Sequence, residues 1–180
     1  RRINIRSKHI SRYQDYPMKN QKAVFAAGCF WGVQYYFDQI PGVNGTVVGY
    51  TGGHTQNPTY EQVCSHTTGH AEAVEVDFDP EQVSYETLCR HFFRLHDPTQ
   101  LNRQGWDVGD SYRSAIFYLN DDQKKIAHQL KSQLASKYDN PIVTEITPYA
   151  TFYPAEDYHQ KYTEKTGQGV GHITYEPIGA

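Results

Sequence analysis

The chain has 180 residues, a formal net charge of −3 and a sequence pI of about 6.3. This charge balance argues against a nucleic-acid-binding protein, which normally presents a basic face. Its apolar runs also fall well short of the roughly 20 residues that a membrane-spanning helix needs. Three cysteines are an odd and sparse number for a secreted disulfide scaffold, so we expect a reducing compartment, the cytoplasm.

The length suits one domain, which we place at residues 21–180, preceded by an N-terminal extension at 1–20. The extension is polar and basic, with no clear periodicity, and it reaches past Pro17. Such a segment is more often a solvated tail than a functional basic arm.

The first half of the domain predicts strands and helices in alternation. Residues 22–27 predict a strand, and the wholly apolar run at 23–27 indicates that it is buried on both faces. Residues 31–40 predict a helix that Pro41 and Gly42 end. A second strand at 45–50 and a short helix that ends at Cys64 follow.

Gly28-Cys29-Phe30-Trp31-Gly32 stands between the first strand and the first helix. Unpaired backbone N–H groups and the helix dipole favour negative charge there, so we expect a lowered pKa for the Cys29 thiol. The alternative is a buried structural cysteine beside two core aromatic residues. The glycines on either side favour the reactive thiol, because they permit a sharp turn and the close approach of a ligand.

Residues 70–78 alternate in the manner of a strand, and Glu72 shares the face of Val74, Val76 and Phe78. A carboxyl group on this apolar face loses part of its hydration, which raises its pKa and favours the protonated form. Glu72 is therefore a candidate neutral acid.

The second half continues with an amphipathic helix at 84–96, in which Cys89 lies on the apolar stripe and is expected to be inert. A long irregular stretch follows at 96–110, of a length that usually carries function. The remaining predicted elements are a strand at 112–119, a helix at 120–138, a strand at 142–152, a short helix at 157–166 and an irregular tail at 167–180. This order predicts an α/β (α+β) fold, a two-layer ferredoxin-like split βαβ sandwich with a mixed sheet.

A metal site is the competing chemistry, because Cys64, His66 and His70 are close in sequence. A turn rather than a helix face separates His66 from His70, and the chain has no CxxC or HExxH motif. We therefore expect no metal and no cofactor. A Cys-His-Asn/Asp acyl transferase is a further option, but no local motif identifies its histidine.

Ordered blocks of sequence make the chain similar to a known family. They are Gly28-Cys29-Phe30-Trp31-Gly32, Gly49-Tyr50-Thr51-Gly52-Gly53, Pro58–Cys64, Thr68–Val74, His96-Asp97-Pro98-Thr99 and Asp107–Ser114. Together they resemble the A-type peptide methionine sulfoxide reductases over about residues 22–165. Several blocks in the same order are far more specific than any one of them.

The resemblance implies an enzyme that reduces methionine-S-sulfoxide, free or in proteins, to methionine. It implies that Cys29 attacks the sulfoxide sulfur and becomes a sulfenic acid, while Phe30 and Trp31 hold the ε-methyl group. Glu72 would protonate the oxygen. The remaining residues that the resemblance assigns to the site are the hydrogen-bond donors Tyr60 and Tyr112, the supporting Asp107, and His159 and Tyr162 near the substrate.

The sequence departs from many relatives at the C-terminal end. Where they carry a recycling cysteine, this chain reads Gly169-Val170-Gly171-His172-Ile173, and no cysteine follows Cys89. An external thiol is the favoured way to reset the sulfenic acid: thioredoxin, glutaredoxin with glutathione, or another small thiol. Two alternatives remain open, namely Cys64 as an unusual resolving cysteine and Gly171 as a replacement of a natural cysteine.

Two other functions would use the same scaffold. A thiol peroxidase or sulfenate redox sensor would also need an activated Cys29, and a binding domain would not. We expect a monomer with no nucleic-acid or membrane partner.

Overall fold

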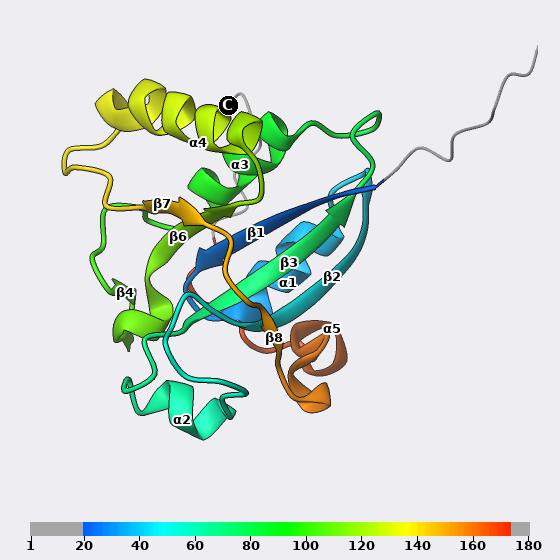
Figure 1. The fold of residues 1–180 in the computed structure, drawn as a ribbon, viewed down its shortest axis with the longest axis vertical. Coiled ribbons are helices and arrows are strands. Elements are labelled where there is room, and N and C mark those ends of the chain that lie inside the picture. The colour runs from blue at the N-terminus through cyan, green and yellow to red at the C-terminus, as the bar shows by residue number, and fades with distance from the viewer. Residues whose placement is uncertain (1–19, 174–180) are drawn as a thin grey trace, which may run out of the picture.

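The structure is a computed structural model, and it describes residues 20–173 (Figure 1). The predicted extension at 1–20 therefore lies outside the described residues except for Asn20, and so does the end of the predicted tail. The elements in chain order are β1 (Gln21–Ala27), α1 (Phe30–Asp38), β2 (Val43–Thr51), α2 (Tyr60–Cys64), β3 (Ala71–Phe78), α3 (Tyr85–Leu95), β4 (Arg103–Gln104), β5 (Asp107–Val108), β6 (Ser114–Tyr118), α4 (Asp121–Leu134), β7 (Glu145–Pro148), β8 (Tyr153–Pro154) and α5 (Tyr162–Thr166). Short 3-10 turns lie at Asp110–Tyr112, Ala135–Lys137 and Asp157–His159.

The main sheet has six strands in the order β7-β6-β1-β3-β2-β8. Its four central strands pair antiparallel in the order β6-β1-β3-β2, which is the ferredoxin-like arrangement of the split βαβ unit. At one edge β7 pairs parallel with β6, so the sheet is mixed. The predicted fold class is confirmed.

The two faces of the sheet are covered differently. On one face, α1, α3 and α4 bury the main core, in which Phe25 of β1 packs against Phe37 and Phe92 with ring centroids 5.2 Å apart in both cases. On the other face, Phe117 and mostly small residues of β1, β3 and β6 form a second cluster, against which Phe152 packs. Figure 1 shows the segment between β7 and β8 crossing this second face from one edge of the sheet to the other.

Two predicted elements in the last third of the chain have the wrong extent. The strand predicted at 142–152 pairs only at Glu145–Pro148, because Pro148 has no N–H to continue the ladder and the chain then turns across the sheet. The helix predicted at 157–166 is broken, since Lys161 adopts a left-handed conformation with φ 58°. Only Tyr162–Thr166 after it is α-helical.

Two smaller corrections concern the middle of the chain. The stretch predicted as irregular at 96–110 contains the β4–β5 hairpin, and the strand predicted from Tyr112 begins at Ser114. Over residues 20–173, no helix combines the length and the apolar character that a bilayer crossing requires.

Candidate active site

The turn between β1 and α1 places Cys29 at the N-cap of the helix, directly after the central strand. Gly28 has φ 91°, a conformation that favours glycine, so the chain can turn sharply before the cysteine. The Cys29 side chain is half-buried and free of any disulfide. The sequence therefore predicted the place of this thiol correctly.

The predicted direction of the Cys29 pKa is wrong for the protein alone. Burial raises the pKa of this thiol well above its ordinary value, and the charge of Glu72 raises it further. The backbone N–H groups of Trp31 and Gly32 lower the pKa, as expected for a helix N-terminus, but their effect is smaller. Desolvation therefore outweighs the helix N-terminus.

Glu72 lies on β3, opposite Tyr50 of β2, and only 2% of it is exposed. Its Oε1 atom accepts a hydrogen bond of 3.2 Å from the Phe30 N–H, whereas the buried Oε2 atom has no partner. Burial raises the pKa of Glu72 to about 8, and Asp107 adds to the rise. This favours the protonated carboxyl group at neutral pH and agrees with the direction of the pKa that the alternation of the strand predicts.

Two phenols lie around this acid. Tyr60 is the first residue of α2, and Tyr112 ends the 3-10 turn before β6. Burial raises the pKa of both phenols, and the charge of Glu72 raises both further. Cys29 and Asp107 also raise the pKa of Tyr112. Such effects on the pKa require the charged groups to be close to one another. The fold therefore brings together the five residues that the sequence assigned to catalysis: Cys29, Glu72, Tyr60, Tyr112 and Asp107.

Glu156 holds the start of α2, and the sequence did not single it out. Its Oε2 atom accepts the Tyr60 backbone N–H at 3.2 Å, and its Oε1 atom accepts the hydroxyl of the buried Tyr50 at 3.2 Å. The first N–H groups of a helix lack intrahelical partners, so this carboxylate satisfies one of them and fixes Tyr60. The only signal in the sequence is its place directly before the Asp157–Tyr162 segment.

Trp31 forms an aromatic wall beside Cys29 together with residues from the C-terminal part of the chain. Its indole N–H donates to Nδ1 of His159 at 2.9 Å, and its ring stacks on Tyr162 with centroids 3.9 Å apart. An indole N–H can only donate, so His159 Nδ1 must be the unprotonated nitrogen of a neutral ring. Burial lowers the pKa of His159, consistent with that form. Phe30, 1% exposed, completes the wall against His159 at 5.3 Å.

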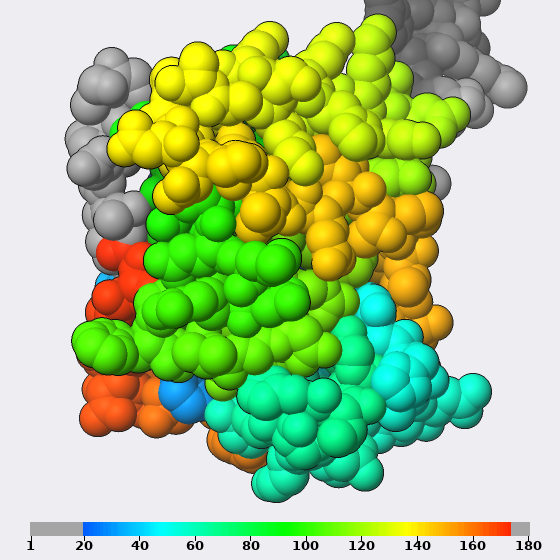
Figure 2. Space-filling model, turned by 90° about the vertical axis from the view of Figure 1, so that its left-hand side faces the viewer, coloured from blue at the N-terminus to red at the C-terminus, as the bar shows by residue number. Residues whose placement is uncertain are grey.

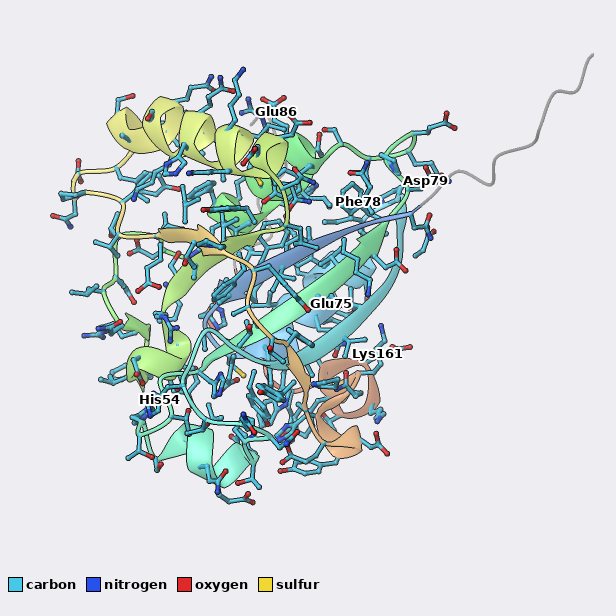
Figure 3. The ribbon with its side chains drawn as sticks, viewed as in Figure 1. His54, Glu75, Phe78, Asp79, Glu86 and Lys161 are labelled. Atoms are coloured by element: carbon cyan, nitrogen blue, oxygen red, sulfur yellow. The ribbon has the colours of Figure 1, made fainter. Side chains whose placement is uncertain are left out.

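The segment around α5 is fastened to α1, which keeps this wall in place. Lys161, labelled in Figure 3, donates its backbone N–H to Gln34 Oε1 at 2.8 Å. Its Nζ atom lies 2.6 Å from Asp38 Oδ2. His159 and Tyr162 stand on either side of this anchored residue, so the structure brings them to Trp31 as the resemblance implied.

The chain that follows α5 reaches the catalytic turn from the other side. A Cβ atom at Gly32 would lie 2.5 Å from the Gly169 carbonyl oxygen, so only glycine allows this approach. His172 donates through Nε2 to the Ala27 carbonyl at 2.8 Å, immediately before the turn. The stretch at 167–173, where the resemblance implies a recycling cysteine, thus lies beside the catalytic turn, and it contains no cysteine.

The other two thiols differ in their surroundings. Cys89 is completely buried on α3, and burial raises its pKa to about 12, consistent with the inert thiol that we expected. Cys64, at the end of α2, is half-buried and hydrogen-bonded with the Tyr60 side chain. Like Cys29, it raises the pKa of Tyr112.

The histidines considered for a metal site are engaged elsewhere. His70 accepts the Gly53 N–H through Nδ1 at 3.0 Å and contacts the Thr55 carbonyl through Nε2 at 2.8 Å. His66 lies 3.5 Å from Asp110. Within residues 20–173, no group of three or more His, Cys, Asp or Glu side chains is placed to hold a metal ion.

The fold and the site together define a class of protein. A buried, mostly protonated carboxyl group, two phenols and an aromatic wall surround a cysteine at a helix N-terminus. These groups can transfer a proton to a polarised, uncharged substrate while a thiol attacks it. The chain is a thiol-dependent enzyme on a ferredoxin-like scaffold.

Comparison with known proteins gives the family. Residues 21–179 match the family "Peptide methionine sulfoxide reductase". A relative from Methanosarcina acetivorans, named peptide methionine sulfoxide reductase MsrA, is 59% identical over 149 residues, which are 82% of this chain and 79% of that protein. The chain belongs to the peptide methionine sulfoxide reductase family, and it is an oxidoreductase that reduces methionine sulfoxide.

Solved structures agree with this assignment. Mxr1 from Saccharomyces cerevisiae in reduced form superposes with a TM-score of 0.81 at 35% identity, over 85% of this chain and 89% of that one. Methionine sulfoxide reductase A of Corynebacterium diphtheriae has a TM-score of 0.78 at 38% identity, over 92% of this chain and 84% of that one. The yeast protein has also been solved in complex with Trx2, with a TM-score of 0.59 at 28% identity, over 81% of this chain and 86% of that one.

Proposed function

We propose that Cys29 is the nucleophile and that Glu72 is the acid in the reduction of the S epimer of methionine sulfoxide. The observation that carries the proposal is the Oε2 atom of Glu72, which is buried and has no hydrogen-bond partner among residues 20–173. Burial raises the pKa of this carboxyl group to about 8, which favours its protonated form at neutral pH. A proton held there can pass to the sulfoxide oxygen. Tyr60 and Tyr112 donate hydrogen bonds to the same oxygen as negative charge develops on it.

The redox step balances at the two sulfur atoms. The sulfoxide sulfur gains two electrons and becomes the thioether of methionine, while the Cys29 sulfur loses two and keeps the oxygen as a sulfenic acid. The thiol proton and the proton delivered by Glu72 remain in the site to complete the sulfenic acid and to restore the carboxyl group. No metal or cofactor takes part in this step.

Because burial raises the pKa of Cys29, the protein alone favours the thiol, and we propose that bound substrate favours the thiolate. A sulfoxide whose oxygen is held by Glu72, Tyr60 and Tyr112 presents a partly positive sulfur to Cys29, and this charge favours the thiolate. The N–H groups of Trp31 and Gly32 support the same ionisation. We infer that Asp107 supports the substrate and the site network from β5.

The aromatic wall supports selection of one epimer. Phe30 and Trp31 are proposed to hold the ε-methyl group, and the hydrogen bond from Trp31 to His159 and the stack on Tyr162 fix the indole. With the methyl group at the wall and the oxygen at Glu72, two substituents of the sulfur are fixed, so only one configuration presents its sulfur to Cys29.

Substitution of each cysteine tests the nucleophile. With dithiothreitol as reductant, Cys29→Ser should form no methionine from a sulfoxide peptide. Cys64→Ser and Cys89→Ser are matched controls for loss of a thiol. Both should still reduce the sulfoxide in the first step, in which Cys29 becomes a sulfenic acid. Methionine formation by Cys29→Ser would overturn the proposal.

We propose that an external thiol, thioredoxin or glutaredoxin with glutathione, resets the Cys29 sulfenic acid. The stretch next to Cys29, residues 167–173, has no thiol, and Cys89 is completely buried. The yeast relative has been solved with Trx2, which supports a thioredoxin-type reductant for this chain. The contact of Cys64 with Tyr60 favours Cys64 as the second candidate for this role.

One turnover without reductant separates the two routes. Reset by an external thiol predicts the loss of one free thiol and a gain of about 16 Da on the Cys29 peptide. A Cys29–Cys64 bridge with the loss of two free thiols would overturn it.

Three further properties stay predictions. They are the cytoplasmic location, which the three free thiols support, the monomeric state, and the division into an extension at 1–20 and one domain at 21–180. Cell fractionation and the molecular mass in solution test the first two.

A further inference from the structure

Three large apolar side chains are exposed together on the loop that carries β4 and β5. Trp106 is 101% exposed, Leu101 67% and Val108 64%. An exposed indole keeps a large apolar area in water, and its amphipathic ring is a common contact residue at interaction surfaces. We call Leu101, Trp106 and Val108 the apolar rim.

The hairpin holds Trp106 firmly at its tip. Gln104 pairs with Asp107, so Gly105 and Trp106 form a two-residue turn, and the positive φ of 58° at Gly105 matches a type II′ turn. The Gly105 N–H donates to Gln100 Oε1 at 2.7 Å, and its carbonyl accepts from Arg103 Nη2 at 2.8 Å. These bonds order the backbone at the tip, so binding a partner there does not have to order the loop.

The inner side of the same hairpin touches the catalytic turn. A Cβ atom at Gly28 would lie 2.8 Å from Gln104 Cβ, and the charge of Asp107 raises the pKa of both Cys29 and Glu72. Figure 2 shows the blue surface near the start of α1 bordered by this green loop, by teal α2 and by the orange C-terminal segment. The hairpin that carries the apolar rim therefore borders the catalytic turn through Gln104 and Asp107.

We propose that the apolar rim binds apolar side chains that flank methionine sulfoxide in a polypeptide substrate. This inference rests on the proposed function, because it requires the sulfoxide to enter beside Cys29. The backbone of an inserted residue stays outside, and its neighbours, about 3.3 Å further along per residue, must pass over the rim of the site. Free methionine sulfoxide has no such neighbours, so the rim selects polypeptides with apolar flanks.

Comparison of three S-sulfoxide substrates tests the proposal. They are a pentapeptide with leucine and phenylalanine beside the sulfoxide, a pentapeptide with glycine there, and the free amino acid. In Trp106→Ala, kcat/KM for the apolar peptide should fall about 5- to 30-fold, as for truncation of an aromatic contact residue. The other two substrates should change less than about two-fold. Because the reaction is expected to be ping-pong, kcat/KM for the sulfoxide does not depend on the reductant.

Leu119→Ala is the matched control. Leu119 is also exposed, at 39%. Ser114, at the start of β6, pairs with Ala27 next to the catalytic turn, whereas Leu119 follows the other end of this strand and so lies away from the turn. Equal losses on all three substrates in Trp106→Ala, no loss on any, or a loss only in kcat/KM for thioredoxin would each overturn the proposal. If the parent enzyme reduced none of the three substrates, the proposed function itself would fail.

Binding can also be observed without turnover. Trp31 and Trp106 are the two tryptophans of the chain. In Cys29→Ser, the apolar peptide should protect the fluorescence of both tryptophans from iodide quenching. In Cys29→Ser with Trp106→Ala, only the part of this protection that belongs to Trp31 in the substrate site should remain. Protection of equal size in both variants would contradict contact with Trp106.

Discussion

The backbone N–H of Phe30 donates to Oε1 of Glu72 at 3.2 Å, and this bond determines which carboxyl oxygen is free to act. Phe30 directly follows Cys29, so the turn that presents the thiol also orients the acid. The other oxygen, Oε2, is buried without a partner. Nucleophile and acid are thus positioned by one short stretch of backbone.

The first prediction concerns proton delivery by Glu72. Glu72→Gln can still offer a hydrogen bond but no proton, so the rate of methionine formation should fall by roughly 10²–10⁴. In the parent enzyme this rate should decline as pH rises through about 8, where Glu72 loses its proton. The measurement is the single-turnover rate from pH 6 to 10.

Glu75→Gln is the control for this substitution. Glu75 is on the same strand with its side chain on the opposite face, where it pairs with Lys22. It should keep the parent rate and pH profile. A near-normal rate in Glu72→Gln would refute the acid role.

The second prediction concerns stability. The pKa of Glu72 is raised from 4.5 to about 8 in the folded chain, so between these values the folded state binds more protons than the unfolded state. The contribution of Glu72 to the free energy of unfolding therefore falls as pH rises, by about 1.4 kcal/mol per pH unit within that window. Below the window the parent and Glu72→Gln should differ little.

Urea unfolding at pH 5 and pH 9 measures this effect. The free energy of unfolding of Glu72→Gln relative to the parent should increase by a few kcal/mol from the lower to the higher pH. A difference that is independent of pH would show that Glu72 is already ionised in the folded protein at pH 5.

The third prediction concerns the thiol in the absence of substrate. Burial and the charge of Glu72 raise the pKa of Cys29, so iodoacetamide should label it more slowly at pH 7.5 than it labels free cysteine. Peptide mapping separates Cys29 from Cys64. At pH 9, where Glu72 is ionised in the parent, Glu72→Gln should be labelled faster than the parent. Labelling of the parent faster than free cysteine would mean that the helix N-terminus outweighs desolvation.

The fourth prediction concerns Glu156. Glu156→Ala leaves the buried Tyr50 hydroxyl and the Tyr60 N–H without their acceptor, which should cost about 1–3 kcal/mol of stability. Because Tyr60 loses its anchor, kcat/KM for the sulfoxide should also fall, by roughly ten-fold. Glu156→Gln can keep both contacts and should recover most of the loss. Parent kinetics in Glu156→Ala would contradict a positioning role.

The sequence predicted the parts of the fold that depend on local pattern. Strict alternation at 70–78 placed Glu72 on the core side with Val74, and the apolar run at 23–27 marked the central strand. The pattern was misleading at 142–152, because β-forming residues continue past the last residue that pairs with β6. A break such as that at Lys161 depends on tertiary contacts with α1, which no local pattern contains.

The sequence predicted which residues lie close together in the candidate site. It did not predict the direction in which the site shifts the pKa of Cys29. The blocks shared with the family named the residues around Cys29 and Glu72, and the fold brings them together. The helix N-terminus suggested a lowered pKa for Cys29, but the extent of burial and the nearby Glu72 reverse the direction. Glu156 acts through contacts with β2 and α2, which are far away in the chain, so sequence patterns did not indicate it. The exposure of the apolar rim depends on how the β4–β5 hairpin is placed on the domain, which the local sequence does not contain.

The most direct test of the central claim is a single turnover with each epimer of a methionine sulfoxide peptide, without reductant. The account predicts close to one equivalent of methionine from the S epimer, none from the R epimer, and an oxygen gained on Cys29. Methionine from the R epimer, or methionine from the S epimer while Cys29 stays a free thiol, would contradict it.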